Sequence, residues 1–452
     1  MRGLAKRLSL RLPTSLRLSH RQARRKRCGA ESIPATAVTA GTLLPRGLAH
    51  LAVVGLAMLA TVNSASSQTT FCQLADYRSY CPAALQLQVI GHWAHNPNPN
   101  LADVSIDGHY AYIGHFWGDE GVTIIDLSDP ANIGNITNPP VYIPTPGPRG
   151  TSITCASGQK KCFNFEYLQV HGGVGFLPST NGGGIFIVNF HDPKNPRLYS
   201  QIDTQWLGAN AVDSFHHVSL DGNYLFAGSS LHQKIFVYDV SNPARPRFVR
   251  VLNFVDVASP VYNLAKNGFL YVSFIEGSTQ IYKLSDLEAA TATPPQPIKS
   301  FASNPRTHHS WPLMSNYLAI AHEHTFTWPG GPGPGDGSAG EVSIWDTGSQ
   351  ANARKISTIN FPTNPAEQPS VHTVAIVGNV LYAAWYEAGL RAYDVSDPRS
   401  PSLVGWYQTG KLEYPGFVTG ESIGAVAVYP FSDVGIAVSD QVTGLWLLAP
   451  PE

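Results

Sequence analysis

The segment Gly389-Leu-Arg-Ala-Tyr-Asp-Val-Ser-Asp-Pro398 decides the fold of this chain, because its ending recurs along the sequence. A hydrophobic strand followed by Asp-x-Ser-Asp/Asn-Pro occurs three times, and a looser version occurs once. The copies are Ile-Ile-Asp-Leu-Ser-Asp-Pro at 124–130, Val-Asn-Phe-His-Asp-Pro at 188–193, Val-Tyr-Asp-Val-Ser-Asn-Pro at 237–243 and Ala-Tyr-Asp-Val-Ser-Asp-Pro at 392–398. Such recurrence predicts a repeat architecture.

Each repeat contains the signals of a four-stranded antiparallel sheet. An apolar strand turns at a pair such as Asp107-Gly108 or Asp221-Gly222 and returns as an aromatic-rich strand. A third strand ends at the proline corner, because proline has no N–H to donate to the ladder, and a fourth strand such as 401–406 follows. The repeats are placed at 102–142, 151–203, 213–254, 258–300, 307–361, 370–408 and 422–450. We therefore predict an all-β fold, a β-propeller of seven four-stranded blades.

The two ends of the repeat region complement each other. The chain ends just after a third strand at 445–448, while residues 87–93 match the fourth-strand sequence at 401–406. We therefore expect the N-terminal strand to complete the last blade and to close the ring, which removes exposed sheet edges.

The strand-and-corner phrases, above all residues 389–401, resemble the LVIVD repeat of exported bacterial and archaeal propellers. The resemblance spans most of residues 87–450, and the repeats at 102–142, 213–254 and 370–408 match best. It implies the propeller fold and a secreted, periplasmic or cell-surface location. It implies no single activity, since one fold hosts many functions.

The N-terminal region has the pattern of an export signal. Residues 1–46 carry eleven Lys or Arg and one acid, residues 47–62 form a short apolar run, and small residues follow at 63–67. We therefore expect an export signal at 1–67, a cysteine-containing segment at 68–86 and the propeller at 87–450. An organelle transit peptide and a retained anchor are the alternatives.

The cysteines agree with export to an oxidising compartment. Outside the leader, Cys72 and Cys81 form one close pair, and Cys155 and Cys162 form another. Close pairs in an exported protein favour two local disulfides. A four-cysteine zinc site is the alternative, although neither pair has the two-residue spacing of zinc ribbons.

Charge limits the partners of the propeller. Beyond residue 46 the chain has 19 basic and 30 acidic residues, a net charge of −11. An acidic body gains no counterion-release affinity for nucleic acid or anionic membranes. We expect a monomer without membrane insertion of the mature domain, and partners that are small molecules or extracellular proteins or glycans.

Three histidines and one glutamate occupy the same position in different repeats. Counting six residues back from each hairpin turn gives the start of the innermost strand, where the residues are His216, His309, His372 and Glu166. The starts of these strands surround the central channel on one face of a propeller, so the four side chains are expected to converge. Imidazole and carboxylate groups are ligands for zinc, iron or copper. The repeat itself does not require histidine, because other repeats have alanine or valine there.

Further polar residues are expected around this ring and could orient or replace its ligands. The group consists of His217 and His308 beside the ring, and of residues at the ends of second strands, namely His115, His322, His324, Glu276 and Glu387. Alternation along the strand places His322 and His324 on one side and Glu323 on the other. The simpler alternative is that these imidazoles only hydrogen-bond water in a wet channel.

Two classes of function remain open from the sequence. One is a metal-dependent enzyme, redox or hydrolytic, whose ion has an open coordination position. Its layout is similar to that of carotenoid oxygenases and methanethiol oxidases of the selenium-binding-protein type, although no sequence motif is shared. The other is a non-catalytic extracellular binding module that uses one face of the propeller.

Overall fold

A computed structural model of the chain describes the propeller and part of the preceding cysteine segment. The described residues are 72, 78–94, 101–116, 121–133, 141–143, 165–180, 183–203, 214–229, 233–254, 260–288, 294–303, 306–323, 340–348, 352–360, 370–410 and 424–452. The expected export signal at 1–67, His324, Cys155 and Cys162 lie outside these residues.

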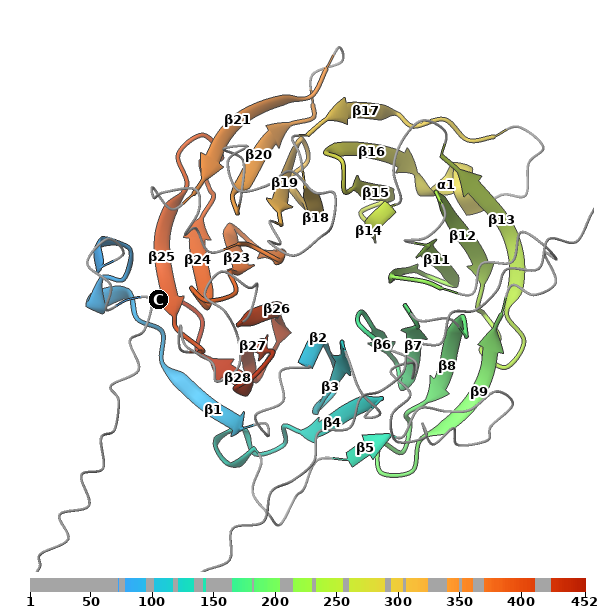
Figure 1. The fold of residues 1–452 in the computed structure, drawn as a ribbon, viewed down its shortest axis with the longest axis horizontal. Coiled ribbons are helices and arrows are strands. Elements are labelled where there is room, and N and C mark those ends of the chain that lie inside the picture. The colour runs from blue at the N-terminus through green and yellow to red at the C-terminus, as the bar shows by residue number, and fades with distance from the viewer. Residues whose placement is uncertain are drawn as a thin grey trace, which may run out of the picture. The chain divides into compact units, whose positions relative to one another are not determined.

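Seven four-stranded antiparallel sheets form the seven blades of a β-propeller (Figure 1). Blade 1 contains β2 (Leu101–Asp107), β3 (Tyr110–His115), β4 (Val122–Asp126) and β5 (Val141–Ile143), and blade 2 contains β6 (Gln169–His171), β7 (Val174–Pro178), β8 (Ile185–Asn189) and β9 (Arg197–Ile202). Blade 3 contains β10 (His217–Asp221), β11 (Tyr224–Ser229), β12 (Lys234–Asp239) and β13 (Arg247–Asn253), and blade 4 contains β14 (Pro260–Lys266), β15 (Phe269–Phe274), β16 (Ser278–Lys283) and β17 (Lys299–Ala302). Blade 5 contains β18 (Thr307–Leu313), β19 (Tyr317–His322), β20 (Val342–Asp346) and β21 (Arg354–Ile359), and blade 6 contains β22 (Thr373–Val377), β23 (Val380–Ala384), β24 (Leu390–Asp394) and β25 (Ser402–Tyr407). Blade 7 contains β26 (Ala425–Ser432), β27 (Gly435–Asp440), β28 (Gly444–Leu448) and the N-terminal strand β1 (Val89–Ala94).

The expected ring closure is confirmed. Strand β1 pairs antiparallel with β28, with Trp93 opposite Leu445, and Figure 1 shows the blue first strand beside the red last one. Gly91 of β1 lies so close to the corner of blade 1 that a Cβ atom would stand 1.9 Å from the carbonyl oxygen of Pro130. The closing strand therefore contacts blade 1 as well as completing blade 7.

The structure explains why the corner sequence recurs. In blades 1, 3 and 6 the aspartate that ends the third strand accepts a hydrogen bond from the backbone N–H two residues later. The donor and acceptor residues are Ser128 and Asp126 at 2.9 Å, Ser241 and Asp239 at 2.9 Å, and Ser396 and Asp394 at 2.8 Å. This Asx turn directs the chain away from the third strand, and proline then prevents its continuation.

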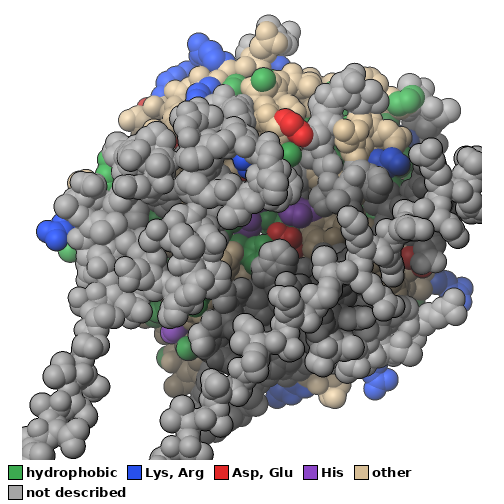
Figure 2. All heavy atoms as spheres, viewed as in Figure 1, with side chains coloured by type: hydrophobic (Ala, Val, Ile, Leu, Met, Phe, Trp, Pro, Cys, Tyr) green, Lys and Arg blue, Asp and Glu red, His purple; other side chains and the backbone are tan. Residues whose placement is uncertain are grey.

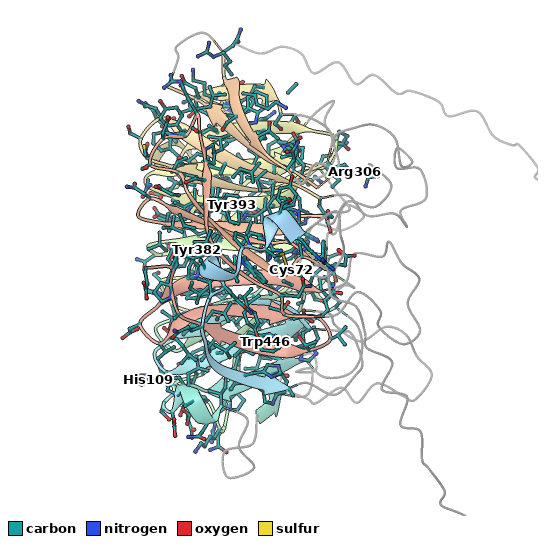
Figure 3. The ribbon with its side chains drawn as sticks, turned by 90° about the vertical axis from the view of Figure 1, so that its left-hand side faces the viewer. Cys72, His109, Arg306, Tyr382, Tyr393 and Trp446 are labelled. Atoms are coloured by element: carbon teal, nitrogen blue, oxygen red, sulfur yellow. A yellow bond between two sulfur atoms is a disulfide. The ribbon has the colours of Figure 1, made fainter. Side chains whose placement is uncertain are left out.

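The ring has two distinct faces around its central channel. The turn face carries the hairpin turns between first and second strands, and the start face is where the innermost strands begin. Figure 3 shows His109, in the β2–β3 turn, and Arg306, just before β18, on opposite sides. Residues that precede the innermost strands are therefore gathered on the start face.

The N-terminal segment covers the edge of blade 6. Its short helices are η2 (Arg78–Tyr80) and η3 (Ala83–Leu85), and the disulfide Cys72–Cys81 is formed. Two other short helices, η4 (Pro130–Asn132) and α1 (Leu284–Glu288), lie in connections between strands. Within the described part of the chain, every helix is too short or too polar to cross a membrane.

Candidate metal site

Two histidines from neighbouring blades stand at the starts of their innermost strands. His372 directly precedes β22, and its backbone N–H donates to the carbonyl of Ala384 at 2.9 Å. His308 lies in β18, where Thr307 pairs with His322 but His309 pairs with Ala321. His308 is therefore the extra residue of a β-bulge, and bulges of this kind redirect a side chain. The two imidazole rings lie face to face, tilted by 32°, with centroids 4.5 Å apart.

Glu323 completes the group from the end of the second strand of blade 5. Its backbone N–H donates to the carbonyl of Arg306 at 3.0 Å, and Arg306 adopts the left-handed region with φ 63°. One carboxylate oxygen lies 3.6 Å from Nε2 of His308, and the other lies 3.9 Å from Nε2 of His372. The ligand atoms of the three residues all lie within 4.8 Å of one another. Among the described residues, this is the group of histidine and acidic side chains that could hold a metal ion.

Backbone hydrogen bonds determine which ring nitrogen of each histidine is free. Nδ1 of His308 lies 3.0 Å from the carbonyl oxygen of His372, and Nδ1 of His372 lies 2.7 Å from that of Val426. A carbonyl only accepts, so each Nδ1 carries the proton. In a neutral ring Nε2 is then an acceptor. Both Nε2 atoms face Glu323, and metal-binding histidines typically have this kind of orienting bond on their other nitrogen.

Two tyrosines contact the group. The hydroxyl of Tyr167 lies 2.9 Å from Nε2 of His372 and 3.1 Å from Nε2 of His308. The hydroxyl of Tyr386 donates to Oε1 of Glu323 at 2.6 Å. Tyr167 precedes β6 in blade 2 and Tyr386 follows β23 in blade 6, so residues from three blades converge here.

The charges of the three residues follow from burial. Burial lowers the pKa of His308 to about 4, against the opposing influence of Glu323. Burial also lowers the pKa of His372. Burial alone would raise the pKa of Glu323, but the adjacent imidazoles and the bond from Tyr386 outweigh it, and the pKa is lowered. Near neutral pH the site therefore holds two neutral imidazoles and one carboxylate.

A second histidine–carboxylate pair lies beside this group. Nε2 of His216, just before β10, lies 3.6 Å from Oε1 of Glu166, just before β6. Their side chains are 14% and 19% exposed, more than that of His308. The His216 ring contacts the rings of Tyr167 and His308, with centroids 4.7 and 6.3 Å away. Figure 2 shows histidine and acidic atoms together near the middle of this view of the ring.

The predicted ligand position in blade 5 is wrong by one residue. His308, expected beside the ring, occupies the ligand position, and His309 instead packs against Tyr262 with ring centroids 3.5 Å apart. The cause is the hairpin turn: three residues separate the paired Leu313 and Tyr317, whereas two residues form the equivalent turns of blades 3 and 6, so counting back from the turn is wrong by one residue. His217 also packs against Tyr262, at 3.9 Å.

Residues expected around the ring have mixed placements. His115 and His322 lie in equivalent positions, and Nε2 of each bonds a third-strand hydroxyl of its own blade, Thr123 at 2.9 Å and Ser343 at 2.7 Å. These bonds brace strands within a blade. Glu276 is exposed in the turn after β15, and Glu387 is partly buried in the turn after β23.

Three members of the site were not predicted. Tyr167 adjoins Glu166, but nothing in the repeat distinguishes its side chain. Tyr386 lies in the left-handed region with φ 28°, which the sequence does not reveal. Glu323 was assigned to the opposite side by strand alternation, but β19 ends at His322, so that alternation does not extend to it. The triplet His322-Glu323-His324 was the sequence signal that could have indicated Glu323 as a site residue.

The fold and this group of residues define a seven-bladed β-propeller with a two-histidine, one-carboxylate group that could hold a metal ion. The LVIVD repeat matches residues 100–138, 215–253 and 369–409, which lie in blades 1, 3 and 6. The chain is thus an LVIVD-repeat protein, as the corner sequences indicated.

One solved structure agrees with the fold alone. A chain in the crystal structure of a mitotic checkpoint complex is 10% identical, with a TM-score of 0.51 over 80% of this chain and 95% of that chain. The computationally designed Ika8 protein is 9% identical, with a TM-score of 0.49 over 80% of this chain and 100% of that one. No curated protein sequence matches the chain.

Proposed function

We propose that His308, Glu323 and His372 bind a divalent transition metal and that the protein is an exported, metal-dependent enzyme. One observation carries the metal proposal. Two unprotonated Nε2 atoms and a carboxylate face one another, and the donor that lies against both nitrogens, the hydroxyl of Tyr167, has a single proton. One Nε2 therefore faces the phenol oxygen without a proton between them, and a cation would satisfy all three acceptors.

The donor set supports particular metals. Two histidines and one carboxylate are typical of non-haem iron(II) sites and of catalytic zinc sites, both of which keep open positions. Ligands around a tetrahedral ion are about 3.3 Å apart at the usual bond lengths. The two His–Glu separations are 3.6 and 3.9 Å, and all three ligand atoms lie within 4.8 Å of one another, so the group would contract on binding.

Surrounding residues support chemistry at such an ion. The ion would supply Lewis-acid activation of water or, with iron, of dioxygen. Tyr386 holds the Glu323 carboxylate in place, and the backbone carbonyls hold both imidazoles. The partly exposed His216–Glu166 pair stands beside the group, where it can contact a bound molecule. Export is supported by the Cys72–Cys81 disulfide, which requires an oxidising compartment to persist.

Cobalt substitution tests this function. The metal-free full-length protein is titrated with Co²⁺, and visible absorption is recorded before and after addition of azide. We expect saturation at one equivalent, with an intense spectrum that azide perturbs because a coordination position is open. A spectrum that azide leaves unchanged would exclude an open catalytic site, and failure to bind Co²⁺ would leave only the non-catalytic binding module.

A further inference from the structure

A cavity occupies the central channel, and none of the three proposed metal ligands lines it. Its volume is about 470 Å³, within the range of small-molecule pockets. Its walls include Asp221 and Gly222 of the β10–β11 turn, so it opens toward the turn face. At its inner end lie His217, His309 and Tyr167. Tyr167 alone among the metal-site residues also lines this cavity.

The outer wall of the cavity is aromatic. Trp311 of β18 and Phe431 of β26 stack with ring centroids 5.3 Å apart and planes inclined by 15°. Phe431 is 43% exposed, so part of this apolar surface is available at the channel opening. A flat apolar group entering the channel would find a surface on which to stack.

Lys266 adds a positive charge to the same wall. Its Nζ atom lies 4.9 Å from the Trp311 ring centroid and 5.4 Å from that of Phe431. Burial lowers the pKa of Lys266, and no carboxylate among the described residues forms an ion pair with it. Two aromatic faces and no carboxylate therefore contact this half-buried ammonium group, which favours an anion beside it.

Trp311 supplies a second donor. Its indole Nε1 is buried and has no hydrogen-bond partner among the described residues, although an indole N–H is a donor only. Nδ1 of His217 and Nδ1 of His309, at the inner end, are buried and likewise without a partner there, and in a neutral ring the tautomer decides whether such a nitrogen donates or accepts. An unsatisfied buried donor such as the indole N–H is costly, so this wall is better suited to an acceptor-bearing ligand than to an apolar one.

The two acidic residues that line the cavity, Asp103 and Asp221, do not strongly oppose an anion. Asp103 of β2 also lines the cavity, and burial raises the pKa of its carboxyl to about 7. Near neutral pH this carboxyl is uncharged for much of the time. Asp221 stays at the rim, in the turn.

We propose that the channel binds a small planar aromatic carboxylate, with its ring on the Trp311–Phe431 wall and its carboxylate bonded by Lys266 and the indole N–H. This proposal is independent of the metal, because its contacts lie on the turn-face side of Tyr167. The carboxylate balances the unpaired ammonium group, and the ring fills the apolar part of the channel.

Isothermal titration calorimetry with 2-naphthoate and its neutral counterpart 2-naphthamide tests the proposal on the full-length protein. We expect 2-naphthoate to bind with one-to-one stoichiometry and the amide to bind at least tenfold more weakly. Lys266→Met keeps the aliphatic stem and should weaken naphthoate at least tenfold. Trp311→Phe, which keeps a ring but removes the N–H, should weaken it severalfold.

Two controls separate this site from the metal site and from charge in general. Lys283→Met removes an exposed lysine at the end of β16, outside the cavity, and should leave naphthoate affinity unchanged. His308→Ala should also leave it unchanged while removing metal. The proposal is overturned if naphthoate does not saturate, if the amide binds equally well, or if Lys266→Met and Lys283→Met behave alike.

Discussion

The hydroxyl of Tyr167 lies 2.9 Å from Nε2 of His372, a nitrogen left without a proton by the bond from Nδ1 to the carbonyl of Val426. The same hydroxyl lies 3.1 Å from the equivalent nitrogen of His308. One phenol proton cannot satisfy both nitrogens, so in the metal-free site one Nε2 atom has no proton from Tyr167 to accept. This imbalance supports the proposed metal site, whereas His115 and His322, each bonded to a hydroxyl, brace their blades.

Removing the Tyr386 hydroxyl should weaken metal binding. Tyr386→Phe deletes the 2.6 Å bond that orients the Glu323 carboxylate. Outer residues of this kind change metal affinity by about 10–100-fold, which competition with a chromophoric chelator measures. Tyr167→Phe is the control, since it deletes a bond that competes with the metal. It should keep or raise the affinity, and an equal loss in both variants would contradict the assigned roles.

The metal-free protein should lose stability as the pH falls below 6.5. His308 has a folded-state pKa of about 4, so between these values the unfolded chain binds a proton that the folded chain does not. Over the whole range from pH 6.5 to pH 4, this proton uptake lowers the free energy of unfolding by about 3 kcal/mol. Asp103, whose pKa is raised to about 7, acts in the opposite direction. Urea unfolding of wild type and His308→Gln at pH 7 and pH 5 measures the contribution of this histidine to the free energy of unfolding. If both proteins lost the same stability between pH 7 and pH 5, the lowered pKa of His308 would be contradicted.

Breaking the Cys72–Cys81 disulfide should loosen the N-terminal segment from blade 6. Nη2 of the buried Arg391 lies 3.8 and 3.5 Å from the two sulfur atoms. The short loop, with a sequence separation of 9, accounts for about 2–3 kcal/mol. Thermal unfolding of the Cys72→Ser/Cys81→Ser protein should show this loss. Cys155→Ser/Cys162→Ser is the comparison, and an unchanged melting temperature in the first variant would show that the segment does not stabilise the ring.

Gly91→Ala should weaken the ring closure. The new methyl group would meet the carbonyl oxygen of Pro130 at 1.9 Å, so β1 must shift from β28 or from blade 1. Overpacking of this kind costs about 1–3 kcal/mol. Gly108→Ala, in a hairpin turn with φ 58° and open space around it, should cost only backbone strain of about 1 kcal/mol. Equal losses in the two variants would mean that the Pro130 contact is not tight.

The fold could be predicted from the sequence because its signals are local and repeated. The corner Asp394-x-Ser396 forms the same Asx turn as its counterparts, so one copy explains the others. The match of residues 87–93 to a fourth strand was enough to predict how β1 closes the ring, which the pairing with β28 confirms.

The site could be predicted only in outline, because its details depend on irregularities that have no local signal. The face and the residue types follow from strand order, and the structure gathers His216, Glu166 and His372 there. The three-residue turn that puts His308 rather than His309 at the ligand position is revealed only by the pairing between β18 and β19. Glu323 lies beyond the end of its strand, where alternation no longer applies.

Metal analysis of the purified mature protein tests the central claim most directly. Elemental mass spectrometry measures the metal content of wild type, Glu323→Gln and His372→Ala. The control is His92→Ala, which removes a histidine of the closing strand that stacks on Trp446. We predict about one equivalent of iron or zinc in wild type and His92→Ala, and none in the other two variants. A folded wild-type protein that stays metal-free after incubation with iron, zinc and copper, or variants that keep the full equivalent, would contradict it.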